Sequence, residues 1–581
     1  MIVLGFSGIP NGDYYSRNYG LRFVGHDSSV AIVVDGEVSF AAEEERFSRE
    51  KHTSKLPVNA LRDGLKASGI GPQDIDLIAY TWSVTLPRLV HMFWHHPLRI
   101  PVQHWPSMGY VGTRVLRDLM WPRRAIRSFR EAAGLPPRKW VGVSHHLGHA
   151  SCAYFTSGFD RAAVLTVDGQ GEDESASLGE FNGVRYQHYQ SIHSPDSVGI
   201  LYGMVTDFLG MRAGWDEYKV MGMSPLGDPS RFTRVFDRLV RLLPDGRYET
   251  HRTAMVFRPG YCDQMLATLF DVPKRDAHAP LEQSHFDIAA GLQAVTEKVL
   301  FHLLHRLRKL TTSADLCLAG GVFLNSVANG KIRRSGLFDR VHVPSVPGDH
   351  GGALGAALWA YHSRSDNVEP RRAASTAFYG PAFTDEEIEV ALQGHESRIE
   401  FHRMENVAEA TAALLAEGKI IGWFQDRMEY GPRALGHRSI LASPLDAGMK
   451  DTVNARIKHR EPFRPFAGAV PEELASQFFE IEGPSPFMQF VVPVIPTIQP
   501  RIPAIVHNGT CRAQTVNRAD DPLFHQLLLA FGKRTGVPIL LNTSFNDADE
   551  PIVCSPQNAL RTFLGTDLDA LVVGGFLVRK V

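Results

Sequence analysis

The feature that most constrains the fold is a strand, an Asp-Gly turn and a returning strand that occur twice in the first third of the chain. The first copy, VAIVVDGEVSFAAEEERFSR, starts at Val30 and turns at Asp35-Gly36, a dipeptide suited to a tight hairpin. The second copy, AAVLTVDGQGEDESASLGEFNGV, runs from Ala162 to Val184. Because both copies present acidic and glycine residues at the turn, they favour a duplicated α/β domain with a ligand cleft between its halves.

Composition sets the scale and excludes some classes of protein. The chain has 581 residues, of which 44% are apolar and 21% charged, so it can bury large cores in two or three globular units. A net charge of -2 disfavours a dedicated nucleic-acid binder. The five cysteines lack CxxC spacing, which indicates neither a disulfide framework nor a thiolate zinc site. We therefore expect a reducing, cytoplasmic compartment.

No segment has the pattern of a signal peptide or a membrane span. The N-terminal MIVLGFSGIPNGD lacks a basic region and is interrupted at Pro10 and Gly12, so we interpret it as a first strand. The apolar stretch 486–506 contains five prolines and the charged Arg501, which a membrane-spanning helix would not carry. We expect no membrane span.

A polar segment, SRSDNVEPRRAAST, separates the two halves of the chain at residues 363–376. Thr384 and Glu387 then have the spacing of a capping box that starts a new helix. We therefore predict two large domains, residues 1–365 and 378–581.

Residues 89–130 combine tryptophans, phenylalanines and arginines with apolar residues. This composition suits a cap over an acceptor site or a surface for a membrane or partner, and it equally suits a helical insertion with arginines on its solvated face. We assign no site there.

Two glycine-rich turns follow buried strands in the middle of the chain. LCLAGGVFLNSVANGK begins as a strand at Leu316, turns at Gly320-Gly321 and continues as a helix near Asn325. In GDHGGALGAALWAY, Asp349 precedes a second glycine turn and an alanine-rich helix. Such turns let a backbone approach phosphate or ribose, but close helix packing explains the small residues equally well.

The motif SHHLGHA places His145 and His149 four residues apart, on one face of a helix, as two imidazoles binding one metal require. His146 would point elsewhere. Asp168 and Asp349, each beside a glycine turn, could complete a site with two nitrogen and two oxygen ligands. Such a set suits Fe(II), Mn(II), Co(II) or Zn(II), and a purely structural role for the histidines stays open.

Two further groups carry possible chemistry. His26, in GHDSS, and Lys51, in REKHTSK, flank the first hairpin, where they could deprotonate a hydroxyl and neutralise an anion or could equally be surface residues near loops. In the C-terminal half, four cationic residues lie in segments rich in aromatic residues, glycine and proline; they are Arg433, Lys458, Arg464 and Arg512. Such segments are typical of rigid loops that bind phosphate. Asn542 and Ser544 add neutral donors at a strand end.

The combination of these motifs, in this order, resembles one family along nearly the whole chain. GHDSS, EEERFSREKH, HHLGHA, VDGQGE, EYKVMG, LAGGVFLN, GDHGGALGAA, MEYGPRALGHRSIL, KHREPFRPF and LNTSFN occur as in the NodU/CmcH family of O-carbamoyltransferases. The resemblance implies an α/β protein in which a duplicated N-terminal Kae1-like domain, of the actin/sugar-kinase/Hsp70 fold, is joined to a C-terminal YrdC-like α/β domain.

The resemblance also implies a reaction at two sites. In the YrdC-like domain, carbamoyl phosphate and ATP, with Mg²⁺, would give carbamoyl adenylate and pyrophosphate on the four cationic residues, with Asn542 and Ser544 orienting oxygens. In the Kae1-like domain the carbamoyl group would pass to a hydroxyl of a natural-product, antibiotic-type acceptor. His26 would act as the base there, and Lys51 would stabilise the carbonyl oxygen or phosphate.

Further roles come from the same resemblance. His145, His149, Asp168 and Asp349 would hold one transition metal, with Fe(II) expected first. Lys219, Gly320, Gly321 and Asn325 would contact nucleotide. Asp426 replaces a glycine that relatives usually carry, so its loop could be reshaped. Residues 10–22 and 89–130 match no motif, and we expect acceptor specificity there.

Three other functions compete with this interpretation. One is a nucleotide-binding regulatory protein of the same fold without transfer chemistry, which the presence of His26, Lys51 and all four presumed metal ligands disfavours. A metallopeptidase would use the HxxxH pair but lacks the glutamate base of HExxH, and it leaves the C-terminal half unexplained. A tRNA threonylcarbamoyl-type transferase is disfavoured by the near-neutral charge.

Overall fold

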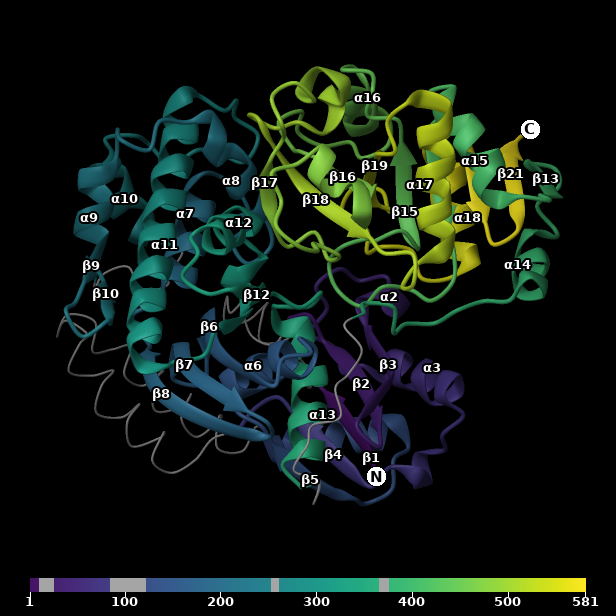
Figure 1. Ribbon diagram of the computed structural model, residues 1–581. Coiled ribbons are helices and arrows are strands. Elements are labelled where there is room, and N and C mark those ends of the chain that lie inside the picture. Colours follow the sequence, from purple (N-terminus) through teal and green to yellow (C-terminus); the bar gives the residue numbers. More distant parts are fainter. Residues whose placement is uncertain (10–25, 84–121, 252–260, 365–375) are drawn as a thin grey trace. The chain divides into compact units, whose positions relative to one another are not determined.

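The computed structural model describes residues 1–9, 26–83, 122–251, 261–364 and 376–581 (Figure 1). These residues form two compact units, one of residues 1–44 and 52–375 and the other of residues 45–51 and 376–581. Residues 365–375 of the predicted linker, the unmatched segment 10–22 and residues 89–121 lie outside the described residues. The sequence analysis did not anticipate that the short segment Glu45–Lys51 packs with the second unit.

Two five-stranded sheets with the same topology form the first unit. In each sheet three consecutive strands pair antiparallel, a fourth strand adds parallel to the first of the three, and a fifth adds parallel to the fourth. The first sheet has the order β3-β2-β1-β4-β5 and the second β8-β7-β6-β11-β12. This pattern confirms the predicted duplicated α/β domain of the actin/sugar-kinase/Hsp70 fold. The strands are β1 (Ile2–Phe6), β2 (Ser29–Val34), β3 (Glu37–Glu43), β4 (Leu77–Tyr80), β5 (Lys139–Gly142), β6 (Arg161–Gly171), β7 (Glu174–Asn182), β8 (Arg185–His193), β11 (Asp315–Ala319) and β12 (Arg340–His342).

The two hairpins seen in the sequence are not equivalent in this duplication. The first joins β2 to β3, whereas the second joins β6 to β7, and the topology relates β6 and β7 to β1 and β2. The prediction of a duplicated domain is therefore correct, but the first hairpin seen in the sequence lies one strand later in its sheet than the second hairpin does. The reason is that β1 and β2 are separated by the long connection 7–28, which leaves no local hairpin signal. His26 lies in the connection between β1 and β2. Asp168 lies near the end of β6, just before the corresponding connection between β6 and β7.

Two helices lie against each other between the sheets. Helix α6 (His145–Phe155) packs on β6 and β11, and α13 (Gly352–His362) packs on β1, β2 and β4. Their backbones approach so closely that a Cβ on Gly355 would lie 1.9 Å from the carbonyl oxygen of Gly148. The small residues of the second glycine turn therefore have a packing role, one of the two explanations that the sequence left open.

The remaining described helices of the first unit include α3 (Val58–Ser68), which packs on β2 and β3. The helix expected near Asn325 is α12 (Ser326–Arg334), which Asn325 caps by accepting the N–H of Ala328. The others are α7 (Val198–Phe208), α8 (Glu217–Met223), α9 (Thr233–Leu239), α10 (Tyr261–Phe270) and the long α11 (Gln283–Leu310), together with the short hairpin β9 (Val240–Leu242) and β10 (Tyr248–Thr250).

The second unit is built on one mixed nine-stranded sheet, with the order β13-β21-β20-β14-β15-β19-β16-β18-β17. Its strands are β13 (Ile399–Arg403), β14 (Ile421–Phe424), β15 (Arg438–Ala442), β16 (Ala467–Pro471), β17 (Val491–Pro493), β18 (Thr510–Val516), β19 (Leu540–Ser544), β20 (Ala570–Val573) and β21 (Phe576–Lys580). Leucine and phenylalanine side chains of α17 (Pro522–Thr535) pack with Trp423 and Leu540 in its main core. It is thus a separate α/β unit with its own core.

Shorter helices complete this unit: α2 (Glu45–Ser48), α14 (Asp385–Leu392), α15 (Val407–Ala416), α16 (Met449–Arg456) and α18 (Pro556–Gly565). The predicted capping box is present, because Thr384 and Glu387 each accept the other's backbone N–H. None of the helices that the structure describes combines the length and the apolar character needed to cross a membrane.

Candidate functional site

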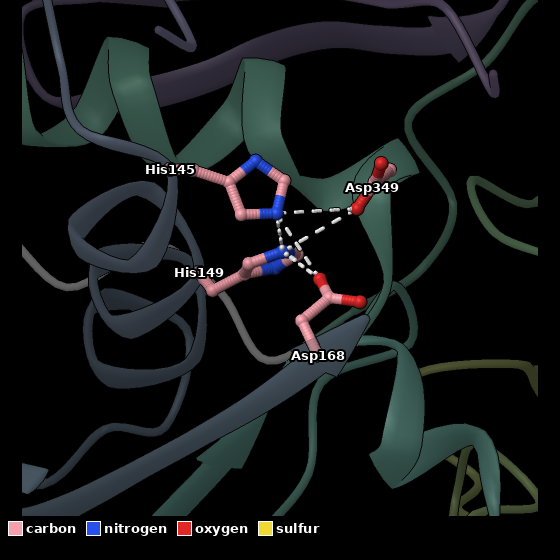
Figure 2. Close-up of side chains that lie close together, drawn as sticks. All are labelled: His145, His149, Asp168 and Asp349. Atoms are coloured by element: carbon pink, nitrogen blue, oxygen red, sulfur yellow. Dashed lines mark hydrogen bonds and ion pairs between the residues drawn. The ribbon is translucent and has the colours of Figure 1, made fainter. Parts of the chain in front are cut away.

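Four side chains in the first unit converge on one point (Figure 2). His145 and His149 come from the first turns of α6, Asp168 from β6, and Asp349 from the short helix η6 (Asp349–Gly351). The two Nε2 atoms are 3.0 Å apart, and Asp168 Oδ2 lies 3.1 Å from that of His145 and 2.9 Å from that of His149. Asp349 Oδ1 is 3.5 Å from both nitrogens. The structure thus brings together all four predicted metal ligands.

The donor atoms suit a single metal ion. Ligands at about 2.1 Å from one ion are separated from each other by about 3.0–3.4 Å, which matches the spacing of these atoms. Two imidazole nitrogens and two carboxylate oxygens fit Fe(II), Mn(II), Co(II) or Zn(II) alike. The donor set therefore fits a transition metal without selecting which one.

Charge holds this cluster together. Burial by itself raises the pKa of Asp168, but hydrogen bonds and charge from His145 and His149 outweigh burial and hold that pKa well below its usual value. Burial disfavours the charged form of His149, yet Asp168 and Asp349 raise its pKa to about 9. A metal ion here would need both Nε2 atoms deprotonated, so metal binding would release any proton that they carry.

A residue that the sequence analysis missed fixes the start of α6. Both oxygens of Glu172 accept the backbone N–H of His145, at 3.2 and 3.1 Å, and Glu172 Oε1 also accepts that of Ser83 at 2.8 Å. A carboxylate at a helix N-terminus satisfies an unpaired N–H and complements the helix dipole. Glu172 therefore orients the helix that carries both histidines. The only sequence signal was its place in the acidic turn GEDES.

His146 faces away from the cluster, as predicted. Its Nδ1 contacts Thr166 Oγ1 at 2.7 Å and its Nε2 contacts the carbonyl oxygen of Glu174 at 3.2 Å. Burial lowers the pKa of His146 to about 4, so this imidazole is neutral at physiological pH. It is a core residue that joins α6 to β6 and β7.

Glycines leave room for the ligands. A Cβ on Gly171 would lie 2.2 Å from Cδ2 of His145, and a Cβ on Gly321 would lie 3.0 Å from Oδ1 of Asp168. Gly320 has φ +98, and its Cβ would lie 2.2 Å from the carbonyl oxygen of Val167. The Gly320-Gly321 turn, which we expected to contact nucleotide, thus also packs against the end of β6.

We expect Gly321→Ala to weaken metal binding by about 10-fold, because the added methyl group displaces the Asp168 carboxylate from its position beside the histidines. Metal retained against a competing chelator measures the effect. Gly148→Ala is the matched control, since its Cβ would meet only the carbonyl oxygen of Gly352 at an ordinary 3.7 Å. Equal retention by the wild type and Gly321→Ala would contradict this role.

His26 lies beside the cluster. Its Nε2 is 3.9 Å from Asp349 Oδ2, and its Nδ1 is 2.6 Å from Asp27 Oδ2. Burial lowers the pKa of His26, but Asp27 first, and then Asp349 and Asp168, raise it to about 10. A divalent ion bound to Asp168 and Asp349 would offset part of their negative charge, and so part of their effect on the pKa of His26.

Asp27 in turn holds two more imidazoles. Its Oδ1 is 2.7 Å from His52 Nδ1 and 3.3 Å from His350 Nε2, and its backbone is left-handed, with φ +61. The donor atoms of Asp27, His52 and His350 also lie close enough together to hold a cation. His52 and His350 were not predicted, and Asp27 was expected beside His26 in the GHDSS motif but was given no role.

Two residues expected at a nucleotide have partners within the protein. Lys219 Nζ is 3.3 Å from Asp216 Oδ1. Asn325 exchanges two side-chain hydrogen bonds with Gln293, at 2.8 and 3.1 Å, and also caps α12. Asn325 thus has a structural role that its place in the motif did not reveal.

The second unit gathers the predicted cations into one cluster. Lys458 is buried, and its Nζ donates to the carbonyl oxygens of Ser544 and Asn546, at 2.9 and 2.7 Å, and to both of their side chains. Burial, followed by Arg460, Lys51 and Arg464, lowers the pKa of Lys458 well below its usual value. Lys458 is thus a desolvated cation fixed by uncharged oxygens.

Arg512, on β18, has the same electrostatic signature. Burial lowers its pKa well below the usual value, and the positive charges of Arg433 and Arg464 lower it further. Arg464 has an acidic partner at 3.6 Å, Glu461 Oε2. Like charges concentrated in a partly buried site are unfavourable until an anion joins them. The structure therefore brings Arg433, Lys458, Arg464 and Arg512 close enough together for their charges to interact.

The predicted neutral donors differ in their roles. Ser544 lies in the cluster, with Oγ 3.3 Å from Lys458 Nζ. Asn542 instead donates its amide to Gln514 Oε1, at 2.8 Å, and to the carbonyl oxygen of Ala434, at 3.3 Å. Sequence reasoning missed both Gln514 and Asn546, because their partners Asn542 and Lys458 lie far away in the sequence.

Asp426 has φ +36, a left-handed backbone that aspartate adopts more readily than most residues. The departure from glycine is therefore accommodated in a conformation that glycine favours.

Lys51 belongs to the segment that packs in the second unit, whereas the sequence analysis grouped it with His26 of the first.

Comparisons with known proteins cover both units. A family model described as the carbamoyltransferase N-terminus matches residues 17–358, and one described as the carbamoyltransferase C-terminus matches residues 412–580. Nodulation protein NolNO of Sinorhizobium fredii is 39% identical, over 96% of this chain and 79% of that protein. Nodulation protein NolO of Bradyrhizobium diazoefficiens is 42% identical, over 75% of this chain and 79% of that one. An uncharacterized Synechocystis protein is 36% identical, over 97% of this chain and 96% of that protein.

Proposed function

The chain belongs to the carbamoyltransferase family, and from that premise we propose that it is an ATP-dependent O-carbamoyltransferase with two reaction centres. In the second unit, carbamoyl phosphate is hydrolysed to carbamate and phosphate. A carbamate oxygen then attacks the α-phosphorus of ATP, held with Mg²⁺, giving carbamoyl adenylate and pyrophosphate. In the first unit, a hydroxyl of a natural-product acceptor attacks the carbamoyl carbon, and AMP leaves.

The observation that carries this proposal is the cation cluster of the second unit. Both substrates of the first reaction are phosphate anions, and their charge would offset the burial and the neighbouring positive charges that lower the pKa values of Lys458 and Arg512. Guanidinium groups donate two parallel hydrogen bonds to phosphate oxygens, so the arginines also orient the groups that react. Cations fixed before the substrate binds stabilise charge that develops during transfer.

In the first unit, His145, His149, Asp168 and Asp349 would hold one transition metal, which when bound supplies a Lewis acid for phosphate or carbonyl oxygens. His26 is the proposed base for the acceptor hydroxyl. Its Nδ1 is held by Asp27, so its Nε2 is the atom that can take the proton. Lys219 and the Gly320-Gly321 turn are proposed to contact the nucleotide, while Asn325 shapes that region by capping α12.

One incubation tests the proposal. The protein is mixed with ATP, Mg²⁺, carbamoyl phosphate and a panel of hydroxylated natural products, and pyrophosphate, AMP and carbamoylated acceptor are measured together. We expect pyrophosphate to depend on carbamoyl phosphate, and AMP to appear in step with the modified acceptor. ATP that stays intact in the presence of carbamoyl phosphate would refute the adenylate route. Carbamoylation of tRNA in place of small acceptors would favour the threonylcarbamoyl-type alternative.

A further inference from the structure

The segment 45–51 is remote in sequence from the rest of the second unit, yet it is built into that unit. Arg46 is almost fully buried, at 1% exposure, and its Nη2 donates to the carbonyl oxygen of Gly431 at 2.5 Å. Burying a guanidinium is costly unless its donors are paired, so this contact specifies where the segment lies. Gly431 is two residues before Arg433, one of the clustered cations.

The loop that carries Arg433 is also held by a buried carboxylate. Glu429 Oε1 accepts three backbone N–H groups, from Leu435 at 2.7 Å, His437 at 2.8 Å and Arg438 at 3.1 Å. A buried carboxylate with three such bonds holds the backbone in one conformation. Arg46 therefore adds a contact at Gly431, so the loop is held two residues before Arg433 by Arg46 and two residues after it by Glu429.

Arg49 holds a second loop. Its Nη1 and Nη2 each donate at 2.7 Å, to the carbonyl oxygens of Ile552 and Pro551, and its backbone is left-handed, with φ +61. The same loop contains Asn546, whose backbone and side-chain oxygens accept from Lys458 and whose Nδ2 donates to the carbonyl oxygen of Glu550 at 2.6 Å. Contacts thus run continuously from Arg49 to the oxygens that hold Lys458.

Lys51 follows two residues after Arg49 and is half-buried. After burial and Arg460, the positive charge of Lys51 lowers the pKa of Lys458. The two ammonium groups therefore lie close enough for their charges to interact. Two cations that share a partly buried region are both stabilised when a polyanion binds between them.

We infer that residues 45–51 complete the anion site of the second unit: Lys51 binds phosphate oxygens of the nucleotide, and Arg46 and Arg49 position the two loops of the site. This inference rests on the proposed adenylate chemistry, because the polyphosphate of ATP and its product pyrophosphate are the ligands it names. It assigns Lys51 to the first reaction, and it makes the second unit incomplete without a segment from the N-terminal part of the chain.

Calorimetric titration of the full-length protein with inorganic pyrophosphate and with ATP, both with Mg²⁺, tests the role of Lys51. We expect Lys51→Ala to weaken pyrophosphate binding by about 10-fold and Lys51→Arg to restore most of it, since a bond to a charged group is lost and then replaced. Lys55→Ala, which removes an exposed lysine of the first unit, is the matched control and should bind as the wild type does. Wild-type affinity in Lys51→Ala would overturn the inference.

Exchange of labelled pyrophosphate into ATP tests the positioning role. Arg49→Met should lower the exchange rate at saturating substrates by about 10-fold, because Lys458 loses its alignment, while pyrophosphate affinity changes little. An unchanged rate at saturation would overturn this part. A wild-type protein that binds neither pyrophosphate nor ATP would refute the proposed function itself, so the two failures are distinguishable.

Discussion

Replacing His149 by alanine is expected to remove the transition metal and stop carbamoyl transfer to the acceptor, while pyrophosphate is still formed. His149 Nε2 lies within 3.5 Å of a donor atom of each of the other three ligands. Removing this imidazole therefore leaves the metal with three ligands and a gap between them. The two carboxylates then face each other with one imidazole fewer to offset their charge. A Lewis acid contributes several kcal/mol to such a reaction, so the transfer rate should fall by about 10³-fold or more.

Metal content of the purified variant and separate assays of the two half-reactions provide the measurement. His188→Ala is the control, because His188 is an exposed histidine of the same unit whose Nε2 contacts only Ser191 among the hydrogen bonds described for it. We expect about one metal per chain in the control and almost none in His149→Ala. A metal-free variant with full transfer activity would eliminate the ligand set, and loss of pyrophosphate formation as well would contradict two separate centres.

Arg512→Ala is expected to abolish carbamoyl adenylate formation and to leave the metal content unchanged. Arg512 lies near the positive charges of Arg433 and Arg464, with which we propose it binds the phosphate groups, and removing one preorganised cation from such a site costs about 10²–10³ in rate. Arg512→Lys keeps the charge but not the planar fork, so it should recover only part of the activity.

The same variant should fold as stably as the wild type or more so. Burial and the neighbouring cations lower the pKa of Arg512 in the folded protein, which means that its charge opposes folding at neutral pH. Removing the side chain relieves that repulsion, although it also removes packing by the arginine stem.

Thermal unfolding and the pyrophosphate assay, run side by side, separate activity from stability. Arg534→Ala is the matched control, since Arg534 is an exposed arginine on α17 of the same unit. A variant that is inactive and clearly less stable would indicate a structural role for Arg512. A stable variant with normal pyrophosphate release would remove Arg512 from the proposed site.

Much of the fold was predictable because it depends on local periodicity. The capping box at Thr384 and the helix near Asn325 are set by residues three or four positions apart, and the structure contains both. The duplication was predictable too, but its register was not. Pairing of β1 with β2 requires closing the long connection 7–28, which no local pattern records.

The ligands themselves were predictable by chemical type. His145 and His149 share a helical face by their spacing, and Asp168 and Asp349 could be proposed from their glycine neighbours. The residues that support them could not. Glu172 acts by accepting the N–H of His145, and Gln514 and Asn546 act through amide groups, so each depends on a partner far away in the sequence.

By itself, then, the sequence determined the helices, the hairpins, the family resemblance and the kinds of side chain available for metal and phosphate. Only the tertiary structure decided which of them meet. Lys51 is the clearest case: it stands in the middle of first-unit sequence, but the segment that carries it packs in the second unit because Arg46 and Arg49 find carbonyl oxygens at Gly431 and at residues 551–552. A buried guanidinium must be paired, and the carbonyls that pair it exist only in the folded chain.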